Sequence, residues 1–307
     1  MSATKACLLW RDARVPGFRA KPRSSFRTGA VVLRRARRLA MAAALLLSTA
    51  QGARAESAGD EHYLALEQGE RVFDAIHSCA LMRWPILEVK DSAETEALAR
   101  RGHALAETVF DRDEAMRAIR EALAATSGTV PPELGAIASR IKAVQATMSP
   151  GSAASEGMAR GDRTVIRGVS EAMAAPELAG DIALTAQRIK RVYEALLAGR
   201  DEELRAMSPE ALEASVEDLL AQTRGEKDEI AIPLLQPAFV RDEARLALQT
   251  VLARLPEEDV ALLAAFYASE TGRAKRDALI AAFRERNETD VRRFIRQLLE
   301  DKRAGRF

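Results

Sequence analysis

One stretch of the chain, residues 255–283, constrains the fold more than any other; it reads LPEEDVALLAAFYASETGRAKRDALIAAF. Pro256 suits the first position of a helix, where its missing N–H would have no partner. The acidic residues 257–259 then lie against the positive end of the helix dipole. The apolar residues that follow share one helical face: Val260, Leu263, Ala264, Phe266 and Tyr267. This pattern predicts an amphipathic helix.

The same stretch predicts a second helix that folds back on the first. The first helix is expected to end near Ala268, and Ser269 can accept a hydrogen bond from a free N–H of the next helix. Glu270 again suits an acidic first turn. Gly272 would lie in that turn, where the missing side chain lets the preceding helix pack closely. Apolar positions on the second helix are Ala274, Leu279, Ile280 and Phe283. We therefore expect a helical hairpin with a very short link.

The hairpin resembles the signature of a bacterial periplasmic domain-of-unknown-function family, numbered 2059. An acidic helix start precedes Leu-x-x-Phe-Tyr-x-Ser-x-x-Gly-Arg, and the matching residues are Leu263, Phe266, Tyr267, Ser269, Gly272 and Arg273. The family usually has Pro directly after the Ser, where this chain has Glu270. The resemblance implies an exported, all-helical protein and carries no agreed activity. We interpret Phe266, Tyr267, Ser269, Gly272 and Arg273 as the candidate binding residues.

Residues 1–55 are interpreted as a leader that carries a secretory signal. Residues 34–38 form a basic region with four Arg, and residues 39–50 form an apolar run. An Ala-x-Ala site ends at Ala55, so the mature chain is expected to begin at Glu56. The apolar run is shorter than the roughly 18 to 20 residues that span a bilayer, although an uncleaved anchor is the alternative. The predicted location is the periplasm, or the outside of the cell.

Charge divides the chain at the same point. Of its 46 basic and 45 acidic residues, 12 basic and one acidic lie in residues 1–55, which leaves 34 basic and 44 acidic. An acidic mature chain without a basic patch studded with aromatic residues does not indicate nucleic-acid binding. Only Cys79 remains after cleavage, so no internal disulfide can form, and the exported fold must depend on its apolar core.

The mature chain is predicted to be an all-α, multi-helix bundle of antiparallel hairpins. Residues 149–161 are small, polar and Gly-rich, and they divide an N-terminal helical region, 56–148, from a C-terminal one, 162–307. Two domains and one bundle with a long loop both fit this pattern. Helical periodicity covers residues 63–82, 91–125, 134–148, 165–173, 182–197, 209–225 and 238–252, and a last helix that carries Val291, Phe294, Ile295, Leu298 and Leu299.

Residue types that support metal, cofactor or nucleophilic chemistry are sparse. His77 and Cys79 have no second pair at zinc spacing, and neither haem, phosphate-loop nor hydrolase motifs occur. We therefore predict no metal, no cofactor and no catalytic residue. Tyr267 is expected in the core, with its hydroxyl reaching the surface or a partner.

The function predicted from these patterns is a binding or scaffolding module of the cell envelope, with an envelope protein or polymer as its partner. A hydrolase of an envelope polymer is the first alternative, and it requires a buried carboxylate with a raised pKa. The second alternative is a peripheral membrane protein. Its basis is the basic terminal helix, since residues 284–307 carry eight Lys or Arg against five acids. A terminal helix docked on the bundle is the simpler interpretation of that segment.

Overall fold

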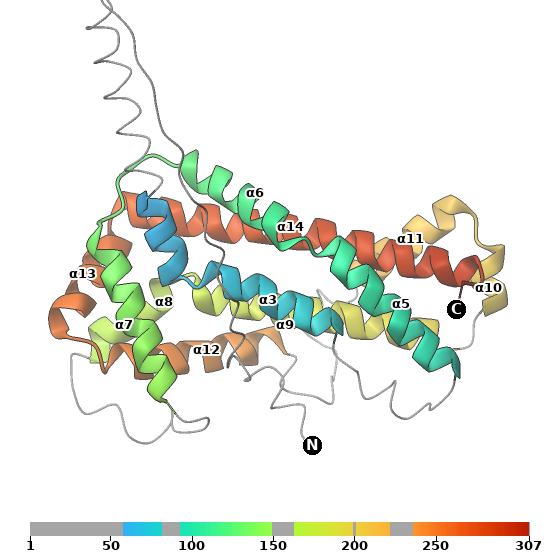
Figure 1. Cartoon of the computed structure of the whole chain (residues 1–307), viewed down its shortest axis with the longest axis horizontal. Helices are drawn as coiled ribbons and strands as arrows, with labels where there is room; N and C mark the ends of the chain where they lie inside the picture. The colour runs from blue at the N-terminus through green and yellow to red at the C-terminus, as the bar shows by residue number, and fades with distance from the viewer. Residues whose placement is uncertain (1–57, 82–92, 149–162, 199–200, 222–235, 307) are drawn as a thin grey trace, which may run out of the picture. The chain divides into compact units, whose positions relative to one another are not determined.

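The computed structural model describes residues 58–81, 93–148, 163–198, 201–221 and 236–306. Within these ranges the chain is 86% helical and has no strand, so the predicted all-α fold is confirmed. The leader, 1–55, and the predicted linker, 149–161, lie outside the described residues. Residues 59–307 form one compact unit (Figure 1). Its helices are α3 (Gly69–Leu81), α5 (Ala93–Val109), α6 (Arg112–Ala124), α7 (Glu133–Thr147), α8 (Arg163–Ala172), α9 (Ala175–Leu196), α10 (Asp201–Ala206), α11 (Pro209–Ala221), α12 (Pro237–Leu252), α13 (Glu257–Ala268) and α14 (Glu270–Arg303).

The longest helix, α14, organises the unit. It has 34 residues, so it is about 50 Å long. In Figure 1 it runs across the unit with α5 and α6 on one side and α9 alongside, while α10 and α11 pack near its C-terminal end. The periodicity had indicated two helices, the second arm of the hairpin and a separate terminal helix. They are one helix because neither Gly nor Pro occurs between Arg273 and Ala304.

Two apolar clusters share α9 and α14. The first joins α3, α6, α7, α8, α12 and α13 with the N-terminal half of α14, where Phe283 contacts Phe73 at a ring-centroid distance of 5.4 Å. The second joins α5, α10, α11 and most of α9 with the C-terminal half of α14, where Phe294 contacts Phe110 at 5.6 Å. The two long helices therefore hold both halves of the fold together.

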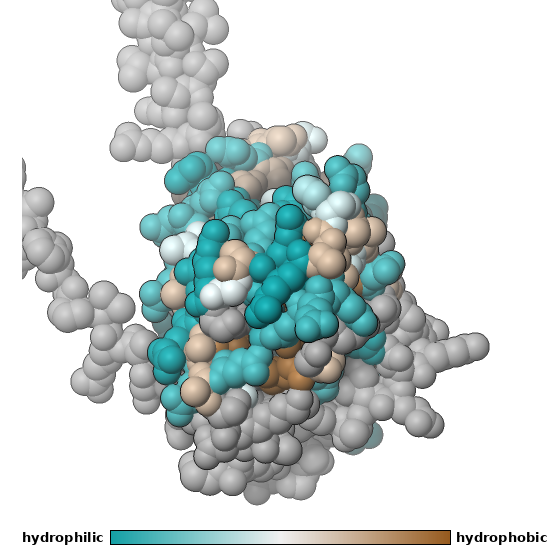
Figure 2. Space-filling model, turned by 90° about the vertical axis from the view of Figure 1, so that its right-hand side faces the viewer, coloured by the Kyte–Doolittle hydropathy of each residue, from teal (hydrophilic) through white to brown (hydrophobic). Residues whose placement is uncertain are grey.

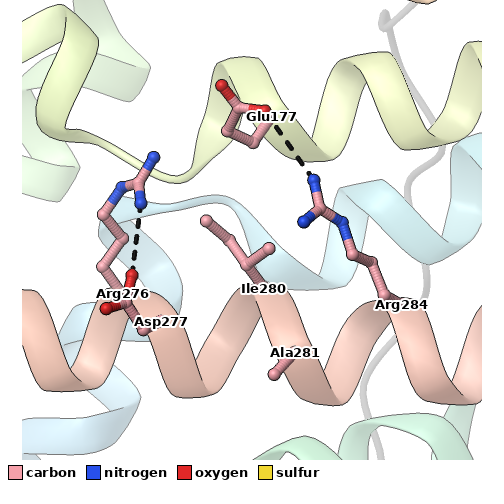
Figure 3. Close-up of a pocket in the computed structure, with 6 residues that line it drawn as sticks. All are labelled: Glu177, Arg276, Asp277, Ile280, Ala281 and Arg284. Carbon is pink, nitrogen blue, oxygen red and sulfur yellow. Dashed lines mark hydrogen bonds and ion pairs between the residues drawn. The ribbon is translucent and has the colours of Figure 1, made fainter.

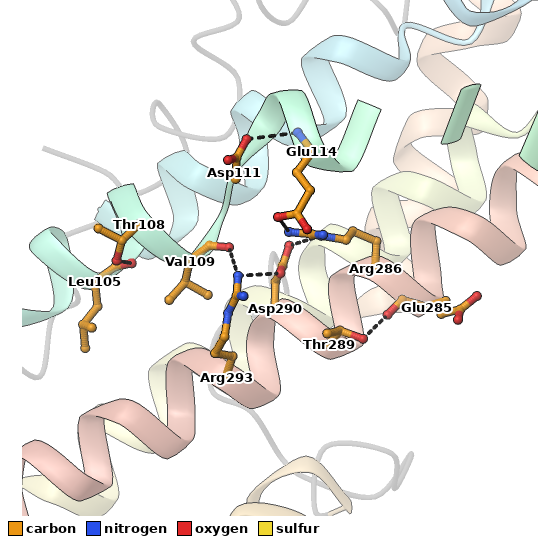
Figure 4. Close-up of polar contacts among 10 residues, drawn as sticks. All are labelled: Leu105, Thr108, Val109, Asp111, Glu114, Glu285, Arg286, Thr289, Asp290 and Arg293. Carbon is orange, nitrogen blue, oxygen red and sulfur yellow. Dashed lines mark hydrogen bonds and ion pairs between the residues drawn. The ribbon is translucent and has the colours of Figure 1, made fainter. Parts of the chain in front are cut away.

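A polar layer on α14 separates the two clusters. Asn287 is buried at a position where the apolar stripe would otherwise continue, and its Nδ2 donates to Oγ1 of Thr185 on α9 at 2.6 Å. Next to it, Arg286 lies between Glu114 of α6 and Asp290 of α14, at 2.8 Å from each carboxylate (Figure 4). Buried polar pairs of this kind can fix the register of packed helices.

The break between α5 and α6 also depends on α14. Sequence periodicity had predicted one helix over residues 91–125, but Asp111 leaves the helical conformation and accepts a hydrogen bond from the N–H of Glu114 at 3.0 Å. Arg293 of α14 donates to the carbonyl oxygen of Val109, the last residue of α5, at 3.1 Å (Figure 4). A carboxylate cap and a guanidinium thus stabilise the free ends of the two helices.

None of the helices among the described residues combines the length and the hydrophobicity that crossing a membrane requires. Figure 2 shows the end of the unit where α10, α11 and the C-terminal end of α14 lie, and the described surface there is mostly hydrophilic. The apolar stripe of α14 is therefore covered by the bundle: Val291, Phe294, Ile295, Leu298 and Leu299 are all buried.

Candidate functional site

The α13–α14 hairpin has the predicted short link. Ser269 alone separates the two helices; its Oγ accepts from the N–H of Gly272 at 3.0 Å and donates to the carbonyl oxygen of Phe266 at 2.6 Å. A Cβ on Gly272 would lie 2.0 Å from that same carbonyl oxygen, so the expected close approach at this glycine is confirmed. Pro256 precedes the first helical residue instead of occupying it.

All five candidate binding residues lie in this hairpin, and each contacts the protein itself. Phe266, Tyr267 and Gly272 are buried, whereas Ser269 and Arg273 are exposed. Arg273 donates to the carbonyl oxygen of Ala268 at the end of α13. These contacts give every member of the set a structural role, and their role in binding stays a prediction.

The hydroxyl of Tyr267 points at a buried carboxylate that the sequence analysis did not identify. Glu67 is fully buried, and the hydroxyls of Tyr267 and Tyr63 both donate to its Oε1, the latter at 3.3 Å. Oε1 also accepts from the N–H of Ala174, and Oε2 accepts from the N–H of Ala175, both at 3.0 Å. We call Glu67, Tyr63 and Tyr267 the buried carboxylate cluster.

The cluster supplies the N-terminal cap of α9. The N-cap residue of α9 is Ala174, which has no side chain able to accept a hydrogen bond. Pro176 has no N–H, so Glu67 satisfies both free N–H groups that precede it. A negative carboxylate at this end of a helix is also favoured by the helix dipole. Glu67 therefore links α9 to α13 through Tyr267.

Burial raises the pKa of all three side chains of the cluster. It raises the pKa of the Glu67 carboxyl, and the hydrogen bonds from Ala174, Tyr267, Ala175 and Tyr63 only partly oppose this effect. Burial likewise raises the pKa of both tyrosines well above the usual value, and the negative charge of Glu67 adds to the increase. The pKa of Glu67 is shifted in the direction that a general acid needs, but its side chain is fully buried.

The helix break at Glu67 explains why the sequence analysis missed it. Periodicity predicted one helix over 63–82, which would place Glu67 as one more solvated acid. The structure instead ends a helix at residue 66 and starts α3 at Gly69, with Gln68 at a positive φ of 56°. The pair Gln68-Gly69 was the available signal, because glycine inside a helical pattern can mark a boundary.

An open pocket of about 290 Å³ lies between the start of α9 and the N-terminal half of α14. Figure 3 shows Arg276 and Arg284 on either side of Ile280, with both guanidinium groups directed toward α9. Glu177, in the first turn of α9, lies opposite. Burial raises the pKa of both Tyr63 and Tyr267, and the positive charge of Arg276 partly opposes this increase. The pocket and the cluster both adjoin the start of α9, because Glu67 caps Ala174 and Ala175 and Glu177 lines the pocket.

Comparisons with known proteins gave no match. Neither a protein-family model, nor a curated protein, nor a solved structure is similar to this chain. The resemblance of the hairpin to family 2059 therefore stays a prediction.

The basic terminal segment is docked, and most of its charge is paired. Of the eight Lys and Arg in residues 284–307, seven form ion pairs with carboxylates of α5, α6, α9, α10, α11 or α14: Arg284, Arg286, Arg292, Arg293, Arg296, Lys302 and Arg306. Arg296, for example, binds both oxygens of Glu213 on α11, at 2.9 and 2.6 Å. This arrangement agrees with the docked-helix interpretation, and membrane binding stays untested.

Metal-ligating side chains do not gather in the part of the chain that the structure describes: no group of three His, Cys, Asp or Glu is placed to hold an ion there. The side chains of His77 and Cys79 lie outside the described ones. The described candidate site thus combines an open pocket lined by Arg276, Arg284, Glu177 and Asp277 with a fully buried carboxyl, Glu67.

Proposed function

We propose that the chain is an exported helical binding or scaffolding module of the cell envelope, released into the periplasm by cleavage after Ala55. The predicted secretory signal in residues 1–55 supports the periplasmic location, and the all-helical bundle supports a binding or scaffolding role. The α13–α14 hairpin and the adjoining pocket form its contact surface in this proposal.

The proposal rests on what the described carboxyls with a raised pKa contact. Glu67, Asp181 and Asp290 are the described carboxyls whose pKa is raised, in each case chiefly by burial. Glu67 accepts four hydrogen bonds from the protein, Asp181 pairs with Arg284 at 2.7 Å, and Asp290 pairs with Arg286 at 2.8 Å. The three carboxyls with a raised pKa are thus engaged by the protein itself: Glu67 and Asp181 join different helices, and Asp290 pairs within α14, which favours binding over hydrolysis.

A co-sedimentation assay separates the three candidate functions. The purified protein is incubated with isolated envelope polymer and, in parallel, with anionic liposomes. Binding to the polymer without release of soluble fragments is the expected result. Release of fragments would favour the hydrolase, and sedimentation with liposomes alone would favour the membrane protein.

The contact surface is best probed with exposed residues. Tyr267→Ala and deletion of 288–307 would remove core packing, because Tyr267 and the stripe from Val291 to Leu299 are buried. Arg273→Glu changes an exposed charge of the hairpin, and Arg100→Gln on α5 is a matched control with an exposed ion pair. If Arg273→Glu and wild-type protein bind the polymer equally, the exposed corner of the hairpin is not the contact. Location is tested by N-terminal sequencing of the periplasmic fraction.

A further inference from the structure

The pocket between α9 and α14 lies beside a group of arginines that shares few buried acids. Arg276 and Arg284 from α14 line the pocket together with Glu177 and Asp277, and Arg241 and Arg245 from α12 reach Glu177 from outside the lining. Glu177 pairs with Arg241 at 3.0 Å, with Arg245 at 3.3 Å and with Arg284 at 3.7 Å. Three of the four guanidinium groups thus share one carboxylate from the first turn of α9, and Arg276 is not among them.

The remaining acidic residues near the pocket differ in how far they are exposed to solvent. Asp181 is buried and pairs with Arg284. Asp242 and Asp277 pair with Arg245 and Arg276, but their side chains are 69% and 75% exposed, so water screens these pairs strongly. Four guanidinium groups therefore face two inner carboxylates, close to the positive end of the α9 dipole.

Arg276 is the least satisfied of the four. Its Nη1 pairs with its own chain neighbour, Asp277, at 3.3 Å. Its Nε–H is buried and has no hydrogen-bond acceptor within the described ranges. A buried donor without an acceptor is unfavourable, so an anion at this wall would gain from pairing with it.

The spacing on α14 sets the size of the ligand. Arg276, Ile280 and Arg284 follow at four-residue intervals on one face, and Figure 3 shows the isoleucine between the two guanidinium groups. The two Arg Cα atoms are separated by eight residues, or about 12 Å of helix. A ligand that reaches both carries two anionic groups joined by carbon that packs on Ile280.

We propose that this pocket binds a short acidic peptide segment, with one carboxylate on Arg276 and a second near Arg284. Carboxylate is favoured over phosphate because Glu177 and Asp181 line the same region, and they repel a dianion more strongly than a monoanion. The proposal rests on the envelope-binding function, for which it names the ligand class.

The test uses the purified protein and two capped peptides, acetyl-Glu-Ala-Ala-Glu-amide and its Gln-Ala-Ala-Gln counterpart, in calorimetric titrations. The acidic peptide should bind and the neutral peptide should not, and binding should weaken as salt is added. Arg276→Gln should weaken binding by about tenfold, the effect of losing one charge-assisted contact. Arg100→Gln, from a similar exposed pair on α5, should bind as wild type does.

A second variant keeps every ion pair of the pocket. Ala281 is exposed and lines the pocket, so Ala281→Glu adds a negative charge there without removing a contact. It should abolish peptide binding while the melting temperature stays unchanged. Equal binding of both peptides, wild-type affinity in Arg276→Gln, tighter binding of inorganic phosphate than of the acidic peptide, or no binding at all would each overturn the proposal.

The same variants separate this proposal from the function on which it rests. If wild type and Arg276→Gln sediment equally with envelope polymer, the protein is an envelope binder and the pocket is not its site. If wild type neither sediments with polymer nor binds peptide, both proposals fail.

Discussion

Glu67→Ala tests whether the buried carboxylate caps α9. The substitution leaves two backbone N–H groups, of Ala174 and Ala175, without their acceptor, and loss of a helix cap costs about 0.5–2 kcal/mol. It also leaves the hydroxyls of Tyr63 and Tyr267 buried without a partner, at about 1–3 kcal/mol each if neither reorients. These costs add to about 2.5–8 kcal/mol, which is a large part of the roughly 5–15 kcal/mol that stabilises a typical domain.

The assay is urea unfolding followed by far-ultraviolet circular dichroism, with the slope of each transition compared between variants. Glu61→Ala is the matched control, because Glu61 lies in the helical segment that ends just before Glu67 but forms an exposed pair with Arg120 at 2.6 Å. The control should lose no more than about 1 kcal/mol. A loss in Glu67→Ala no larger than in the control would refute the capping argument.

A double-mutant cycle tests whether the Tyr267 hydroxyl interacts with the Glu67 carboxylate. Tyr267→Phe should cost about 1.5–3 kcal/mol in the wild type, because it removes a hydrogen bond to a carboxylate. The same substitution should cost less in the Glu67→Ala background, where the acceptor is already gone. Equal costs in the two backgrounds would mean that the hydroxyl and the carboxylate do not interact.

Three further predictions concern pH, close packing and a buried ion pair. The pKa of Glu67 is raised in the folded protein, so its stabilising contribution is full below the ordinary Glu pKa of 4.5 and is lost as pH rises through the pKa of the folded state. The free energy of unfolding of the wild type minus that of Glu67→Gln should therefore fall with rising pH. Gly272→Ala should lower the free energy of unfolding by about 1–3 kcal/mol or more, because the added Cβ clashes with backbone atoms. Gly168→Ala on α8 should be neutral or stabilising, because nothing lies within 4 Å of the added Cβ. Thermal unfolding of the two variants distinguishes these outcomes. Lys275→Met should cost about 3–5 kcal/mol, since it leaves the buried Asp60 carboxylate without the ammonium that lies 2.7 Å away, and the additional change Asp60→Leu should recover much of the loss in urea unfolding.

Local sequence signals predicted the hairpin well. Ser269 and Gly272 act through contacts within a few residues of themselves, so spacing alone indicated their roles. The cap at Asp111 had a similar local signal, since Glu114 follows it at capping-box spacing, and the continuous apolar pattern on both sides obscured it.

The buried carboxylate cluster could not be predicted in the same way. Glu67 contacts Ala174 and Tyr267, which are 107 and 200 residues away along the chain. Only the packing of α9 and α13 around the break at Gln68 makes Glu67 a cap and not a surface acid. The pocket has the same origin, because Arg276 and Glu177 become neighbours only when α9 and α14 pack together.

The position of α14 along the chain has a consequence for biosynthesis. This helix is the last one in the described chain, yet it supplies Phe283 to one apolar cluster and Phe294 to the other. Neither cluster is complete before α14 has been synthesised, so both halves of the fold depend on one helix that follows all their other helices in the sequence.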